Sequence, residues 1–152
     1  MKKMKTHKKL FSLVLVSLLM FVFAFSCFAQ ENAQVIKTYT EDLGNGITAV
    51  VTITKADGLT RSSTTHTVSK EYYSSGTYIG NAALIASFYY DGSTARATGA
   101  SGAGSGANGW SYGGQSTGTS GNRAYLNATL SNGSRNVPVS LSLTCSPSGN
   151  IS

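Results

Sequence analysis

The sequence predicts an all-β protein, an antiparallel β-sandwich of about six to eight strands, and three observations lead to that prediction. Turn signals built from Gly, Asn, Asp and Ser recur at short intervals along the chain. The runs between them are rich in Thr, Val, Ile and Tyr, which suit a pleated and half-buried surface. Several runs alternate apolar and polar residues with period two, as strands with one solvated face do.

The first 29 residues differ from this domain. Five lysines precede an uncharged apolar run at 10–25, and small residues follow at Ser26, Cys27 and Ala29, which is the pattern of a secretory signal peptide. We expect cleavage after Ala29 and export of residues 30–152 as a single β-sandwich domain, with no transmembrane segment left. In the alternative, Cys27 becomes a lipid-modified first residue that anchors the protein to the cell surface.

The charge of the whole chain is misleading. Lys and Arg number 12 against 6 Asp and Glu, but five of the lysines lie in the predicted signal peptide. The exported part then carries seven basic and six acidic side chains and is nearly neutral. A nearly neutral domain lacks the basic surface that nucleic-acid binding requires, so no nucleic-acid partner is expected.

The N-terminal half begins with a predicted hairpin. Residues 47–54 place Ile47, Ala49 and Val51 on one face, and residues 35–41 pair with them across a Gly-Asn-Gly turn. A long polar strand, or a pair of strands, follows at 59–73.

Residues 81–90 have a helical alternative. Asn81 can cap a helix, and the Ala and Leu residues that follow it favour one. Ser87 to Tyr90, ahead of an Asp-Gly turn, favour a strand instead, and we predict a strand.

A second hairpin is predicted at the C-terminus, where 124–130 and 137–145 both alternate and an Asn-Gly turn joins them. Pro138 cannot donate a backbone hydrogen bond, so it belongs near the strand start or on a sheet edge. Cys145 lies on the apolar face of the second of these strands. The other cysteine, Cys27, is removed with the signal peptide, so Cys145 has no partner within the chain. We therefore predict a buried, unpaired thiol, with an interchain disulfide as the alternative.

Residues 99–121 are unusual in composition. Nine of the 23 are Gly and seven are Ser or Thr, and no charge occurs between Arg96 and Arg123. We interpret this Gly/Ser-rich segment as a long loop that is functional or mobile. Residues 104–109 fit the G-x-G-x-x-G pattern of dinucleotide sites, but without a βαβ unit the match is attributed to the glycine content.

The segment also supplies the predicted ligand-binding residues. Trp110, the one tryptophan, and Tyr112 share a face if the chain is extended, and they can stack on a sugar or anchor a protein partner. Asn108 and Gln115 provide polar groups beside them. The structural alternative, which we favour, is that the two aromatic residues attach the segment to the core.

Catalytic and metal sites are not predicted. The exported part contains one His and one Cys, too few for an ordinary zinc or copper site, and its carboxylates are scattered. His66 is the one possible histidine base, and we interpret it as an exposed strand residue. We therefore expect no catalytic residues, no cofactor and no enzymatic activity.

Two stretches carry a resemblance. SFYYDG at 87–92 and LSLTCSPSGNIS at 141–152 resemble small secreted proteins of clostridia-like Gram-positive bacteria, and ASFYY at 86–90 is similar to a stretch of the lactococcin 972 bacteriocin family. The resemblance implies a secreted, β-rich protein. The expected function is non-catalytic binding of an extracellular ligand at a cell surface, on a glycan or on a protein. The alternative is a bacteriocin-like or toxin-like protein that acts on other cells.

Overall fold

The computed structural model describes residues 33–56 and 62–152, and it confirms the all-β prediction. These residues form no helix and eight antiparallel strands. In chain order the strands are β1 (Gln34–Gly44), β2 (Ile47–Lys55), β3 (Ser63–Ser74), β4 (Thr77–Tyr90), β5 (Ala95–Gly106), β6 (Ser111–Ser120), β7 (Arg123–Ser131) and β8 (Asn136–Thr144). The predicted signal peptide with Cys27, and residues 59–61 of the predicted polar strand, lie outside the described residues.

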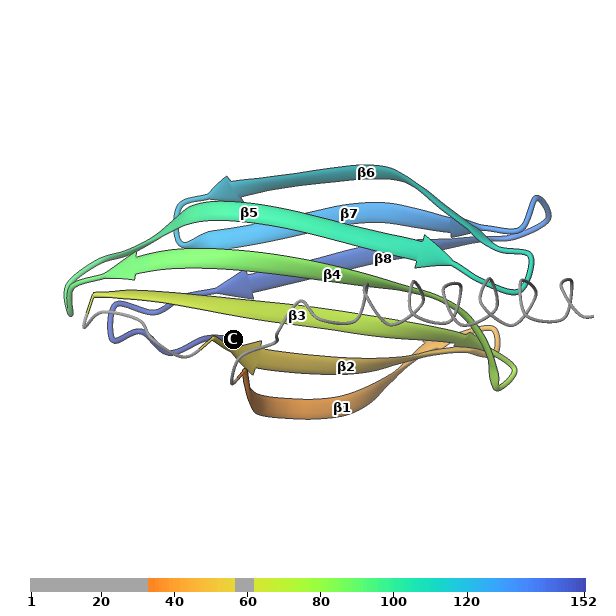
Figure 1. The fold of residues 1–152 in the computed structure, drawn as a ribbon, viewed down its shortest axis with the longest axis horizontal. Helices are drawn as coiled ribbons and strands as arrows, with labels where there is room; N and C mark the ends of the chain where they lie inside the picture. The colour runs from red at the N-terminus through yellow and green to blue at the C-terminus, as the bar shows by residue number, and fades with distance from the viewer. Residues whose placement is uncertain (1–32, 57–61) are drawn as a thin grey trace, which may run out of the picture. The chain divides into compact units, whose positions relative to one another are not determined.

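The strands form two sheets in a simple order. A five-stranded sheet runs β1-β2-β3-β4-β5 and a three-stranded sheet runs β6-β7-β8, so every hydrogen-bonded neighbour is also a neighbour in the chain (Figure 1). The smaller sheet packs over β3, β4 and β5, with β8 over β3 and β6 over β5. The two sheets therefore enclose one hydrophobic layer, as in a β-sandwich.

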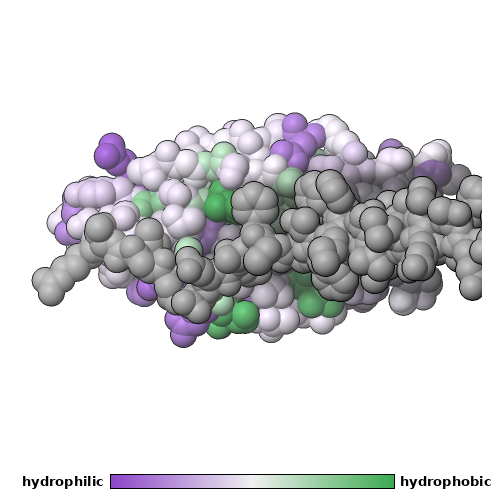
Figure 2. Space-filling view, viewed as in Figure 1, coloured by the Kyte–Doolittle hydropathy of each residue, from purple (hydrophilic) through white to green (hydrophobic). Residues whose placement is uncertain are grey.

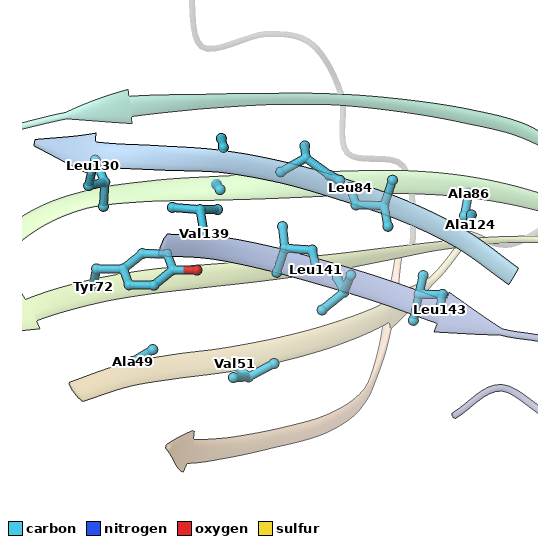
Figure 3. Packing of buried hydrophobic residues seen from close by; sticks show 14 of the residues in the cluster. Ala49, Val51, Tyr72, Leu84, Ala86, Ala124, Leu130, Val139, Leu141 and Leu143 are labelled. Atoms are coloured by element: carbon cyan, nitrogen blue, oxygen red, sulfur yellow. The ribbon is translucent and has the colours of Figure 1, made fainter. Parts of the chain in front are cut away.

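The core follows from the alternation of the strands. In β8 every second residue from Val137 to Leu143 is buried, and the residues between them are exposed. Leu141 and Leu143 point into the same layer as Leu84 of β4, and Tyr72 of β3 lies beside Val139 (Figure 3). Pro138 sits near the start of β8, which is an edge strand, as predicted.

Tight turns join β1 to β2, at the predicted Gly-Asn-Gly turn, and β3 to β4. Asn45 and Gly46 have φ angles of 54° and 72°, and Ser75 and Gly76 have φ angles of 48° and 81°. Two consecutive positive φ angles are the mark of the turn type that matches the twist of a β-hairpin. Both hairpins are thus held in register by their turn residues.

Two segments with alternative predictions, 81–90 and the long polar run, form strands. Residues 81–90 belong to β4, so the helical alternative is wrong there. Within the described residues, the long polar run is a single strand, β3, which pairs with β4 over its whole length and with β2 from His66 to Ser74. Its apolar content is low because its outward face consists of Ser, Thr and Glu side chains and ends at Tyr73.

The Gly/Ser-rich segment at 99–121 is not a loop, which corrects the interpretation from sequence. It forms the second half of β5, the connection 107–110 and all of β6. A Cβ on Gly102 would meet the Leu126 side chain and the Ala83 backbone oxygen, and one on Gly104 would meet the Tyr112 ring. The glycines therefore let β6 and β7 lie close against β5, and they serve packing rather than mobility.

Candidate functional site

The outward face of the five-stranded sheet carries the candidate site. Along each strand alternate residues point away from the smaller sheet, and the register aligns them into rows across the strands. One row contains Glu71, Asn81 and Ser105, and the next contains Ser69, Ala83 and Ala103. We call this surface the outer face.

A shallow hollow of about 380 Å³ lies on the outer face over β3, β4 and β5. Its floor is open because the side chains there are small, and longer polar side chains stand at its side. The residues that line it are Ser69, Lys70, Glu71, Asn81, Ala82, Ala83, Ala103, Gly104 and Ser105. Of these, Lys70, Ala82 and Gly104 belong to the inward side of their strands.

The polar groups of the hollow are oriented by hydrogen bonds. Asn81 Oδ1 accepts bonds from the Ser105 backbone N at 3.2 Å and from Ser105 Oγ at 3.1 Å. This leaves the Asn81 Nδ2 amide to donate to a ligand. Glu71 Oε2 accepts from the Tyr73 hydroxyl at 2.9 Å, and its carboxylate keeps further capacity as an acceptor. The hollow thus presents a donor and an acceptor side by side.

Two tyrosines adjoin this end of the outer face. Tyr73 and Tyr78 pack edge to face, with ring centroids 5.7 Å apart. The hydrogen bond to Glu71 raises the pKa of Tyr73 above its ordinary value, which favours the protonated hydroxyl as the donor to the carboxylate. The pair gives the polar hollow a rigid aromatic border.

The four residues predicted from sequence lie elsewhere, at the junction of the two sheets. Trp110 and Tyr112 are partly buried and pack against the hydrophobic core. Tyr112 donates its hydroxyl to Gln115 Oε1 at 2.8 Å, and Gln115 Nε2 donates to the Gly102 carbonyl at 2.9 Å. Asn108 Nδ2 donates to the Tyr78 carbonyl at 2.8 Å. These groups join β6 and the 107–110 connection to the larger sheet.

His66 is buried, so the exposed position expected from sequence is wrong. It lies on the inward face of β3, 3% exposed, because the run from Thr64 to Val68 turns its even-numbered side chains inward. Its Nε2 bonds Thr64 Oγ1 at 2.7 Å, while Nδ1 has no hydrogen-bond partner of good geometry among the described residues. Burial, and then the Lys55 charge, lower the pKa of His66, although the Thr54 backbone favours the charged form slightly.

Cys145 is buried and unpaired in the structure. It extends the inward side of β8 just beyond the end of that strand, and its backbone N donates to the Asn122 carbonyl. Burial raises the pKa of the thiol, which disfavours the reactive thiolate. The position fits a small apolar core residue.

A second crevice, of about 220 Å³, lies between the β1–β2 hairpin and the start of β8. Leu43 and Pro138 line it, and Arg135 closes one side by donating from Nη2 to the Asn45 carbonyl at 3.0 Å. It has one charged side chain and no convergent set of polar groups. The hollow on the outer face offers more for recognition.

No group of three or more His, Cys, Asp or Glu side chains able to hold a metal occurs in the part of the chain that the structure describes. In the same residues, no helix has the length and apolarity to cross a membrane. Comparisons with protein-family models, with curated proteins and with solved structures give no match.

The hollow was missed by sequence reasoning because its members come from three strands. Glu71, Asn81 and Ser105 are far apart in the chain and meet only through the register of β3, β4 and β5. The available signal was the alternation of β3, which places Glu71 and Ser69 on its outward side. Trp110 was a candidate because it is the one tryptophan, but the rarity of a residue type does not indicate whether its side chain points to solvent or to the core.

Proposed function

We propose that the protein is a secreted, non-catalytic binding module that recognises a neutral glycan through the hollow on the outer face. Export rests on the signal-peptide pattern of residues 1–29. The observation that carries the binding proposal is the hollow itself, where the Glu71 carboxylate and the Asn81 amide stand over a floor of small side chains.

The chemistry of the hollow matches that of a sugar. Sugar hydroxyls donate and accept hydrogen bonds, and Asn81 Nδ2 and the Glu71 carboxylate supply the complementary groups. Small residues such as Ala83 and Ala103 leave room for a ring above the sheet. The Tyr73–Tyr78 pair offers an aromatic surface at the border, against which the apolar side of a sugar ring can rest.

The test fills the hollow without disturbing the core. Ala103 is exposed, so Ala103→Gln adds a longer side chain over the floor of the hollow. Ser140→Gln, on the exposed side of β8, is the matched control. We expect the wild-type protein and the control to bind neutral polysaccharides on an array of β-glucan, α-glucan, mannan and galactan.

The Ala103→Gln variant should bind at least about tenfold more weakly, a loss of roughly 1.4 kcal/mol, with an unchanged melting temperature. If the wild-type protein binds no glycan of the array, or if the filled variant binds as well as the control, the proposal is wrong.

A further inference from the structure

The outer face continues beyond the hollow as an uncharged surface. One row of the register runs across all five strands, through Thr38, Thr52, Ser69, Ala83 and Ala103. The next row runs through Val35, Thr54, Thr67, Ile85 and Ser101. Both rows lie at right angles to the strands and combine hydroxyl groups, methyl groups and two larger apolar side chains, those of Val35 and Ile85.

Thr38 Oγ1 and Thr52 Oγ1 bond each other at 3.5 Å, but other hydroxyls of these rows have no hydrogen-bond partner among the residues that the structure describes. No hydrogen bond involves the side chains of Thr54, Thr67 or Ser101 among the described residues, whereas Thr65 and Ser87 bond each other at 3.0 Å in the row beyond. Ile85 stands among the free hydroxyls with 46% of its surface exposed. A surface that combines free hydroxyls with exposed apolar side chains is complementary to a sugar chain, which has both hydroxyl groups and apolar C–H faces.

No charged side chain belongs to these two rows. In the described part of the sheet, the charges of the outer face are Asp42 and Glu71 toward one end, with Glu71 in the row next to Ser69, and Arg96 at the other end, where its guanidinium stacks 5.3 Å from the centre of the Tyr89 ring. An anionic polymer would meet the Glu71 carboxylate in the hollow and would find no cation along the rows. Where described residues are visible in Figure 2, most atoms are pale, with separate hydrophilic groups toward the edges of the view and a few hydrophobic side chains between them.

We propose that the ligand is an extended neutral polysaccharide chain that enters the hollow and continues across β1 to β5 along the uncharged rows. This inference rests on the proposed function and adds the length and charge of the ligand. Five strands at about 4.8 Å spacing give a path of roughly 19 Å, which is longer than a disaccharide. Affinity must then increase with chain length until the path is filled.

The test compares di-, tetra- and hexasaccharides of the four neutral polymers by isothermal titration calorimetry. We expect the hexasaccharide of the bound polymer to bind at least about tenfold more tightly than the disaccharide. Thr54→Lys should weaken hexasaccharide binding to the level of the disaccharide and leave disaccharide binding intact, because Thr54 lies on the path but outside the hollow. Ser140→Lys, on the other sheet, is the matched control.

A second variant tests the same path in case Thr54→Lys fails to fold. Ile85→Thr keeps a β-branched residue at an exposed position, and it should also weaken only the longer ligands. Equal affinity for all lengths, with disaccharide binding still lost in Ala103→Gln, would overturn this inference while the proposed function stands. Preferential binding of an anionic polymer, polygalacturonate or dextran sulfate, would contradict the inference that the ligand is neutral.

Self-association is a competing role for the same surface. If light scattering shows a dimer of the wild-type protein that Thr54→Lys separates into monomers, the uncharged rows are an interface between two copies and the inference is wrong. Absence of binding to every neutral glycan overturns the proposed function and this inference together.

Discussion

At the scale of single residues, glycine decides how closely the two sheets approach. Gly102, Gly104 and Gly106 lie on the inward side of β5, and a Cβ at each would collide with atoms of the smaller sheet or of the connection leading to it. Gly118 has a similar role within the smaller sheet, because a Cβ there would lie 2.6 Å from the Tyr125 hydroxyl oxygen across the strand pair. Tyrosine rings thus occupy the space that glycine leaves.

Gly104→Ala is expected to destabilise the protein strongly. Its Cβ would meet both the Tyr112 ring and the Asn81 carbonyl oxygen, the latter at 2.7 Å, so strand and ring must both move. We expect a loss of about 1–3 kcal/mol, the usual effect of overpacking. Gly113→Ala is the control, since nothing lies within 4 Å of its Cβ position. Chemical denaturation measures both variants, and equal stability would contradict the packing role of Gly104.

His66 is expected to make stability depend on pH. Its pKa is lowered in the folded protein from an ordinary value of 6.5. The unfolded chain therefore binds the proton more readily, and stability falls as the pH drops below that value. The groups beside the ring are Lys55 of β2, Thr64 of β3 and Ala86 of β4, and none is an acid that would stabilise the charged form.

Denaturant titration at pH 7 and pH 5 measures this effect, because carboxylates titrate mainly below that range. The wild-type protein should lose stability between the two values, and His66→Gln should lose clearly less. A wild-type midpoint that stays constant from pH 7 to pH 5 would contradict a buried, neutral His66.

At the scale of the elements, the β5–β6 pair shows where sequence reasoning succeeds and where it does not. The runs 47–54 and 137–145 were predictable, because large apolar residues alternate in them and mark the buried face directly. In β5 the inward, partly buried face is made of Ala and Gly, so the alternation of the strand is not visible as an alternation of large apolar and polar residues. The identity of the residues that fill this space, Leu126 and Tyr112, depends on the other sheet.

Trp110 tests the junction of the two sheets. Its side chain is partly buried against the core, and its backbone N closes the connection by donating to the Ala107 carbonyl at 3.0 Å. Trp110→Ala should therefore lower the unfolding free energy by about 3 kcal/mol through the cavity it leaves. Binding to neutral polysaccharides at a temperature where the variant is folded should be unchanged. Loss of binding without loss of stability would return the ligand site to Trp110.

At the scale of the whole domain, one edge strand of each sheet, β1 in the larger and β8 in the smaller, is protected against further pairing. The edge strand β1 has register irregularities near each end and carries Lys37, Glu41 and Asp42 between them. The edge strand β8 contains Pro138, which cannot donate a backbone hydrogen bond. Such edges discourage the addition of a strand from a second chain.

Pro138→Val is expected to weaken this protection. Valine restores a backbone donor on the outer edge of β8 and has a high β-propensity. The variant should show a concentration-dependent increase in mass by analytical ultracentrifugation, while the wild-type protein stays monomeric. Ser140→Val, which adds the same side chain without a new donor, is the control, and equal behaviour of the two variants would show that the edge is not what prevents association.

The sequential order of the strands also bears on how the chain acquires its structure. Within each sheet, every strand pairs with the strand that precedes it in the chain, so the backbone pairing is local in sequence. Domains with local contacts fold faster than sheets assembled from distant segments. Two hairpin series, β1–β5 and β6–β8, can therefore form independently. The step that remains is their association through the 107–110 connection, when the glycines of β5 meet Tyr112 and Leu126. We expect this association to be the slow step in refolding, and substitutions at those glycines to slow folding more than substitutions on the outer face.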